Sequence, residues 1–236
     1  MSERRLYRRP WRIDVTVRDG VPRLVAATEL ARISANALNA ATALDAAPGL
    51  ATALDAATAP GLATTPGAAP TPDAAPTPDP ARPFRAASLG LILSDDHELA
   101  ELNERHMAKH GPTDVLSFPL LPPGAFPPHE GRDAPERQGD GVVPGPAGTW
   151  DTDFALPPDA RLHLGDIVVS VERAVAQAEA GRGGWTGAVR WSPADELRLL
   201  VVHGTLHVCG WDHAEPTERA AMRRLEASIL GIEPPR

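Results

Sequence analysis

Three of the eight histidines in this 236-residue chain lie close together in the stretch VVHGTLHVCGWDH, residues 201–213. His203 and His207 are four residues apart in an apolar segment, so on a helix their rings lie on one face, a turn apart. Glycine tolerates the left-handed conformation that ends a helix, and Gly210 follows three residues after His207. The chain can then turn back and bring His213 to the other two rings.

Three imidazoles that meet at one point can hold a divalent metal and leave a position open for water or substrate. We therefore expect one divalent ion, zinc, on His203, His207 and His213, although neutral imidazole also suits other late first-row metals. For a single histidine on an apolar helix, the alternative is a hydrogen-bonded core residue. Asp114 and Asp212 are candidate catalytic acids. The alternatives are a backbone hydrogen bond at a strand start for Asp114, and helix capping or solvent exposure for Asp212.

Two segments interrupt the predicted core, and the first of them is poor in bulky apolar residues. Of its 26 prolines, many fall in a low-complexity Ala/Pro-rich insertion, residues 42–83, and a loop insertion covers residues 121–160. The predicted core of a single domain over 1–236 is therefore about 12–40, 86–120 and 161–232. The two segments 45–83 and 121–160 have charges of −3 and −5, which account for the whole net charge of −8. The acidity therefore does not exclude a polyanionic substrate.

Hydrophobic periodicity outside the insertions predicts both strands and helices. Predicted strands cover 12–17, 89–93, 114–120 and 164–170, and predicted helices cover 23–44, 95–106, 171–180, 192–209 and 216–231. Helical crossovers favour parallel neighbours, whereas the last two strands follow each other without a helix and can pair antiparallel. The prediction is an α+β fold with a mixed, mostly parallel four-stranded sheet (one antiparallel strand), packed with about five helices and zincin-like.

Composition excludes several classes of protein. A single cysteine, Cys209, rules out an internal disulfide and fits a reducing compartment. The sequence has neither a run of 18 apolar residues nor a signal-peptide pattern, so we expect a cytoplasmic protein without a membrane partner. Five arginines within residues 1–12 form a basic patch, which is either a solvated arm or an RNA contact.

Residues near the histidine motif, and the other histidines, are assigned plainer roles. Cys209 points away from the 203/207 face and is expected to be a buried small residue. Trp211 is expected to pack the turn after Gly210, although an aromatic ring can also stack on a base. Histidines without a partner pattern are expected on the surface: His97, His110, His129 and His163.

The spacing of the histidines is similar to the metzincin protease pattern H-E-x-x-H-x-x-G-x-x-H. One residue differs, because Gly204 stands where the protease has its general base, a glutamate. Without that carboxylate a peptidase lacks the group that deprotonates the metal-bound water. A zincin-like peptidase is therefore the weakest of the functions that the motif allows.

The full motif HGTLHVCGWDH resembles the H-G-x-L-H-L-x-G-Y/W-D-H signature of the YbeY family, bacterial rRNA maturation factors and metal-dependent endoribonucleases. The segments LN at 102–103, PTDVLSF at 112–118 and LGDIVVS at 164–170 match further blocks of the family in the same order. Many members carry Tyr-Arg before the TDVLSF block, where this chain has His106 and Met107. In the family that arginine is thought to act on the RNA, and because it is absent here no catalytic arginine is assigned.

The resemblance implies a single-strand-specific, metal-dependent endoribonuclease. Its role would be maturation of the small-subunit (16S) rRNA 3′ end and ribosome quality control. The implied partners are single-stranded rRNA and the small ribosomal subunit, and DNA is not expected. The absence of the arginine at Met107 leaves a second possibility open: a non-catalytic ribosome assembly factor with a structural zinc site.

Overall fold

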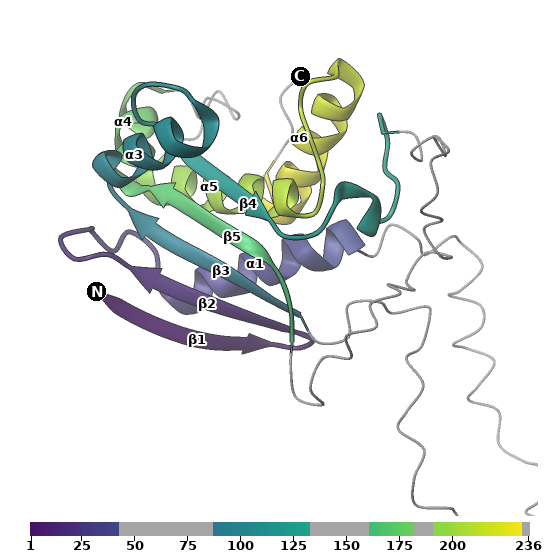
Figure 1. The fold of residues 1–236 in the computed structure, drawn as a ribbon, viewed down its shortest axis with the longest axis horizontal. Coiled ribbons are helices and arrows are strands. Elements are labelled where there is room, and N and C mark those ends of the chain that lie inside the picture. The colour runs from purple at the N-terminus through teal and green to yellow at the C-terminus, as the bar shows by residue number, and fades with distance from the viewer. Residues whose placement is uncertain (43–86, 133–160, 182–190, 233–236) are drawn as a thin grey trace, which may run out of the picture.

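The computed structural model describes residues 1–42, 87–132, 161–181 and 191–232, and the chain forms one mixed sheet flanked by helices (Figure 1). The strands are β1 (Ser2–Arg8), β2 (Trp11–Val17), β3 (Ala87–Ser94), β4 (Val115–Pro119) and β5 (Leu162–Ser170). The helices are α1 (Ala27–Thr42), α3 (Asp96–Met107), α4 (Val171–Glu179), α5 (Pro193–Val208) and α6 (Pro216–Leu230), with a short 3-10 turn, η2 (Pro123–Ala125).

The sheet has the strand order β1-β2-β3-β5-β4. Strands β2, β3 and β5 are parallel, and the edge strands β1 and β4 are each antiparallel to their neighbour. The α+β class, the mixed sheet and the antiparallel pairing of β4 with β5 are therefore confirmed. The prediction of four strands with one antiparallel strand was wrong, because β1 adds a fifth strand that is also antiparallel to its neighbour.

The fifth strand lies in the arginine-rich segment at residues 1–12, for which the sequence indicates either a solvated arm or an RNA contact. Strand β1 pairs with β2 along its whole length, from Ser2 opposite Val17 to Arg8 opposite Trp11. Of its side chains, Leu6 packs against the core, whereas its arginines are exposed. Backbone pairing with β2 thus makes the strand, and the interpretation as a solvated arm was wrong.

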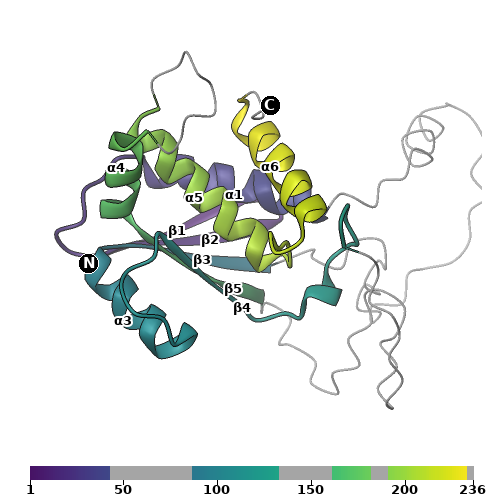
Figure 2. The same ribbon diagram turned by 90° about the horizontal axis from the view of Figure 1, so that it is seen from above.

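Helices cover both faces of the sheet unequally (Figure 2). Helices α1 and α5 lie on one face, where the alternate residues Trp11, Ile13, Val15 and Val17 of β2 are buried in the main core. Helix α3 lies on the other face over β4 and β5, with a smaller cluster built on Leu99, Leu116 and Val168. Among the described helices, none lies over β1 and β2 on that second face.

Helix α5 begins where the sequence predicts and runs against the sheet. The side chain of Ser192 accepts a hydrogen bond from the backbone of Asp195, whose carboxylate in turn accepts one from the backbone of Ser192. Helix α1 begins at Ala27 and not at Arg23, because Ala26 accepts the first helical hydrogen bonds and the residues before it are not helical. The other predicted helix boundaries agree with the structure to within two residues.

The two predicted insertions differ in what the structure describes. Residues 43–83 and 133–160 lie outside the described residues, and with them the Ala/Pro-rich segment. Residues 121–132 are described, and there Phe126 and His129 are buried. The start of the second predicted insertion is therefore part of the packed structure. Among the helices in the described ranges, none has the length and hydropathy needed to cross a membrane.

Candidate metal centre

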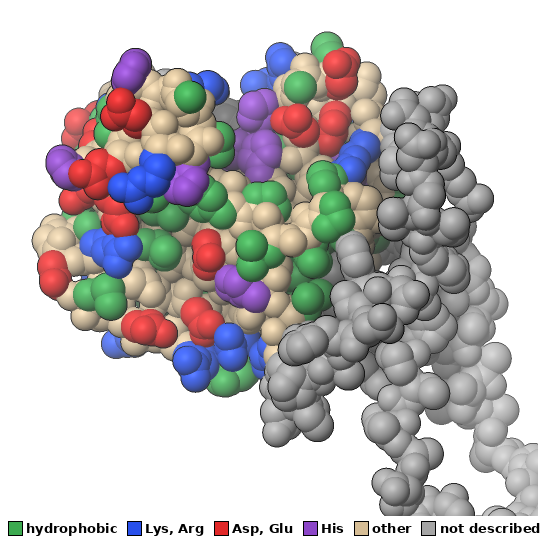
Figure 3. All heavy atoms as spheres, viewed as in Figure 1, with side chains coloured by type: hydrophobic (Ala, Val, Ile, Leu, Met, Phe, Trp, Pro, Cys, Tyr) green, Lys and Arg blue, Asp and Glu red, His purple; other side chains and the backbone are tan. Residues whose placement is uncertain are grey.

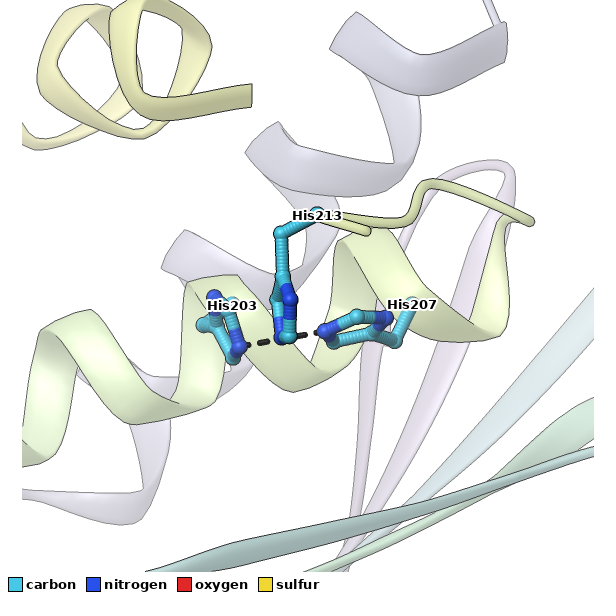
Figure 4. Close-up of side chains that lie close together, drawn as sticks. All are labelled: His203, His207 and His213. Carbon is cyan, nitrogen blue, oxygen red and sulfur yellow. Dashed lines mark hydrogen bonds between the residues drawn. The ribbon is translucent and has the colours of Figure 1, made fainter. Parts of the chain in front are cut away.

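Three histidine rings converge beside helix α5 (Figure 4). His203 and His207 project from α5, and His213 points between them from the turn that follows. One ring nitrogen of each lies within 4.8 Å of the others, and Nε2 of His203 lies 3.1 Å from Nε2 of His207. In the space-filling view, histidine side chains lie in a hollow of the surface between the parts formed by α3 and α6 (Figure 3).

The end of α5 forms the turn that brings His213 back. The backbone N–H of Trp211 donates to Leu206 O at 3.1 Å, and that of Gly210 donates to His207 O at 3.0 Å. This pair of bonds is the Schellman motif, which requires a left-handed residue after the helix cap. Gly210 supplies it with φ +83°. The predicted glycine turn is therefore confirmed.

The donor set fits a divalent metal. A tetrahedral ion with Zn–N bonds of about 2.0–2.1 Å separates two ligand nitrogens by roughly 3.3 Å, close to the distance between His203 and His207. Burial, together with the neighbouring His203 and His213, lowers the pKa of His207 to about 4. His207 is therefore neutral at pH 7, and neutral imidazole is the form that binds a metal. The cluster thus has the features of a metal site.

A carboxylate behind the cluster orients the first ring. Nδ1 of His203 lies 2.7 Å from Oε1 of Glu226 in α6, and the Glu226 side chain is only 4% exposed. A carboxylate at this place favours the tautomer with the proton on Nδ1, so Nε2 of His203 is left with a free lone pair toward His207. Carboxylates commonly hold metal-binding histidines in this way.

Gly204 lies on the face of α5 that meets the sheet. A Cβ atom at this position would lie 2.7 Å from Cγ2 of Ile167 and 3.0 Å from Cγ2 of Val115. The hydroxyl of Ser117 donates to the Gly204 carbonyl at 3.0 Å and ties β4 to the helix. A glutamate, the general base of a metzincin, therefore has no room at position 204.

A loop packs against the turn that carries His213. Nε2 of His129 lies 2.7 Å from Oε1 of Glu218, and its ring stacks on Trp211 with centroids 3.8 Å apart. Arg132 donates from Nη1 to Gly210 O at 2.5 Å. The prediction of a surface position for His129 was wrong, because a buried carboxylate eighty-nine residues later pairs with it.

The other residues singled out by the sequence have plain roles. Cys209 is buried, and burial raises the pKa of its thiol, while Trp211 packs the turn, as predicted. His97 and His110 are exposed, as predicted. His163 is only partly exposed, between the hydroxyl of Ser88 at 3.1 Å and the carboxylate of Asp166 at 3.2 Å.

The two candidate catalytic acids are not alike. Asp114 accepts hydrogen bonds from the backbone of Val115 at 2.9 Å and from Gln177 at 2.9 Å. Burial raises its pKa, but the hydrogen bonds from Gln177 and the backbone outweigh burial and lower it overall. Asp114 thus secures the start of β4, which was its alternative interpretation. Asp212 lies next to His213, whose backbone N–H donates to it at 2.7 Å, and that bond lowers its pKa.

His106 and Met107, which stand where a Tyr-Arg pair is expected, lie at the end of α3. Met107 is 43% exposed, and the ring of His106 contacts that of Phe118 edge to face, with centroids 5.2 Å apart. Asn103 is buried and donates to Gly111 O at 2.8 Å, so this asparagine fixes the loop that leads into β4. The LN block thus has a structural role here.

Two acids of the site, Glu218 and Glu226, were missed by the sequence reasoning. Both lie in α6 at four-residue spacing with Met222, which is fully buried. Residues at that spacing share one helix face. Acids on a stripe that also holds buried apolar residues were therefore the signal that could have identified them.

Comparison with known proteins agrees with this geometry. A family described as "Endoribonuclease YbeY" matches residues 80–232. Proteins named "Endoribonuclease YbeY" are 41% identical over 148 residues in Mycobacterium sp. (strain KMS) and 40% identical over 147 residues in Mycolicibacterium smegmatis. Each alignment covers 61% of this chain and 63% of the relative, so the chain spans less than two thirds of their length. The solution structure of TM1509 from Thermotoga maritima aligns over 64% of this chain and 74% of that one, with 19% identity and a TM-score of 0.32.

Proposed function

The chain belongs to the YbeY family, and from this premise we propose that it is a metal-dependent endoribonuclease that cleaves single-stranded RNA. The observation that supports the proposal most directly is the convergence of His203, His207 and His213, with Glu226 behind the first of them. We propose that the three histidines bind one divalent ion, with zinc as the first choice because the donors are imidazole nitrogens.

The chain's own residues would arrange the reaction. When bound, a divalent ion offsets negative charge on a phosphate oxygen and lowers the pKa of water that it binds. Glu226 holds the proton of His203 on Nδ1, so the free nitrogen of that ring faces the site. His207 stays neutral because it is buried and lies beside two other imidazoles. Asp212, ionised at neutral pH, stands at the rim of the site as the nearest candidate for a proton acceptor.

Phosphodiester cleavage is favoured over peptide hydrolysis by the position of Gly204. The peptidase general base has no space there, since its side chain would clash with Ile167 and Val115. RNA hydrolysis does not depend on a carboxylate at that position. The substrate that we propose is ribosomal RNA, with maturation of the small-subunit rRNA 3′ end as the process and the cytoplasm as the location.

The arginines of β1 add support for a polyanionic substrate. Arg8 and Arg9 are exposed and meet no carboxylate among the described residues, and Arg161 lies 5.5 Å from the centre of the exposed Tyr7 ring. Figure 3 shows arginine side chains at the lower edge of the molecule, over the β1–β2 hairpin. Cations and an exposed aromatic ring are the groups that contact the phosphates and bases of single-stranded RNA.

Cleavage of a labelled single-stranded RNA by the zinc-loaded protein tests the proposal. We expect the wild type to cleave and His207→Ala, purified in the same way, to be inactive. His110→Ala is the matched control, because it removes an exposed histidine outside the cluster. Equal cleavage by all three would mean a contaminating ribonuclease. No cleavage by a wild type that binds zinc would favour a non-catalytic assembly factor, as the methionine at position 107 allows.

A further inference from the structure

The loop of residues 129–132 packs against the turn between α5 and α6 through two polar contacts and one stacked ring pair. His129 contacts Glu218 at 2.7 Å and stacks on Trp211 with an angle of 13° between the ring planes. Arg132 donates to the carbonyl of Gly210 at 2.5 Å. The side chains of His129 and Glu218 are 1% and 8% exposed, so this pair is almost fully removed from water.

The carboxylate of Glu218 joins the loop to the metal-binding turn. Its Oε1 atom also accepts a hydrogen bond from the backbone N–H of Asp212 at 2.8 Å, next to His213. On the other side of the ligand, Arg219 donates from Nε to the carbonyl of His213 at 2.9 Å. The backbone on both sides of the His213 side chain is therefore held by residues of α6, and His129 holds one of these residues in turn.

Close approach makes the fit between loop and turn specific. Gly131 has φ +84°, and a Cβ at this residue would lie 2.3 Å from the backbone nitrogen of Glu218. A Cβ on Gly210 would lie 2.8 Å from Nη1 of Arg132 and 3.0 Å from Cα of Pro123. Only glycines at 131 and 210 allow the loop, the turn and the start of α6 to meet at these distances.

The three ligands differ in how they are fixed. His203 and His207 are placed by a single helix, so their separation is set by helix geometry. His213 has an exposed side chain on a turn, so its place depends on whatever holds that turn. His129, Glu218, Arg132 and Arg219 hold the turn from outside α5.

We propose that His129 and Glu218 are positioning residues that set the place of the third ligand, His213, so that the loop and the metal centre form one unit. The proposal rests on the proposed metal site. Removing the groups that hold a metal-binding side chain in place typically lowers the affinity for the metal 10- to 100-fold. We expect a loss in that range when the His129–Glu218 contact is removed.

Titration with Co²⁺ and competition for Zn²⁺ with a chelator test this proposal without any assay of activity. We expect His129→Ala to bind both ions 10- to 100-fold more weakly than the wild type, with an altered Co²⁺ absorption spectrum. The matched control is His110→Ala, which should bind as the wild type does. If His129→Ala does not fold, His129→Phe replaces it, because an aromatic ring can still stack on Trp211 while the hydrogen bond to Glu218 is lost.

A double-mutant cycle separates positioning from general destabilisation. In a His213→Ala background the third ligand is gone, so adding His129→Ala should not weaken metal binding further. An equal loss in both backgrounds would overturn the proposal, as would wild-type affinity in His129→Ala. A wild type that binds neither ion would instead overturn the metal site itself, and with it the proposed function.

Discussion

Nδ1 of His203 in α5 lies 2.7 Å from Oε1 of Glu226 in α6, twenty-three residues later in the chain. The carboxylate is almost fully buried, and α6 follows the turn that carries His213. The helix after the histidine motif therefore completes the site, because it supplies both the group behind one ligand and the contacts that fix another.

Replacing Glu226 should weaken metal binding without removing a ligand. Glu226→Gln keeps the shape but loses the charge that favours the proton on Nδ1 of His203, so we expect Zn²⁺ affinity to fall about 10-fold or more. Competition with a chelator at pH 7 measures this. Glu215→Gln, at the exposed start of α6, is the control and should bind as the wild type does. Unchanged affinity in Glu226→Gln would show that the carboxylate does not orient the ring.

Gly204→Ala should destabilise the protein although alanine is the better helix former. The new Cβ would lie 2.7 Å from Ile167, and overpacking of this kind costs about 1–3 kcal/mol. Urea unfolding measures the change in free energy. The control is an exposed position of α6, Ser228, where no overpacking is expected. There the Ser228→Ala protein should be more stable than the Ser228→Gly protein by about 1 kcal/mol. A Gly204→Ala protein as stable as the wild type would contradict the close contact between α5 and the sheet.

Acid should weaken the link between β2 and α3. Arg18 donates to Glu98 from Nε at 2.8 Å and from Nη2 at 2.5 Å, and this contact lowers the pKa of Glu98. A carboxyl whose folded pKa is depressed stabilises the fold above its unfolded pKa of about 4.3. That stabilisation is lost as the pH falls through the folded value. Because both side chains are partly exposed, we expect less than about 1 kcal/mol.

The measurement for this pair is the free energy of unfolding of Glu98→Gln and of the wild type at several pH values. The difference should be present at pH 7 and should disappear at low pH, where the wild-type carboxyl is also protonated. Glu104→Gln, an exposed residue of the same helix, should differ less from the wild type at pH 7. A difference that is constant with pH would rule out the charge of Glu98 as its cause.

Cys209 should be unreactive in the folded protein. Its side chain is buried beside the end of α5, and burial raises the pKa of the thiol, so the reactive thiolate is suppressed at pH 8. We expect a thiol reagent to label the native protein slowly and the urea-unfolded protein at once. Rapid labelling of the native state at low urea would mean that the end of α5 opens without global unfolding.

The parts of the fold that the sequence predicted are those with a strong local pattern. Helix α5 has a Ser-Pro start, an apolar body and a glycine end, and its histidines share a face, so both helix and cluster follow from neighbouring residues. Strand β1 was missed because SERRLYR has little apolar alternation, and its structure depends on hydrogen bonds to β2.

The site residues that the sequence did not predict were missed for a different reason. His129 and Glu218 are eighty-nine residues apart, and their contact exists only because the loop before β5 returns to α6. Glu226 looks like any acid of a surface helix until α6 is placed against α5. Spacing in sequence identifies ligands on one helix, but it does not identify the residues from other elements that hold them.

RNA binding should depend on the arginines at the end of β1. Arg8→Gln with Arg9→Gln removes two exposed cations without disturbing a described ion pair. For a single strand, each lost phosphate contact reduces the salt slope of binding by about 0.7, so the double variant should lose about 1.4. Arg32→Gln with Arg223→Gln, exposed arginines of α1 and α6, is the charge-matched control and should bind as the wild type does. Equal slopes in both double variants would mean that net charge, and not the β1 surface, governs RNA binding. Measured on a His207→Ala background, the result does not depend on whether the protein cleaves RNA.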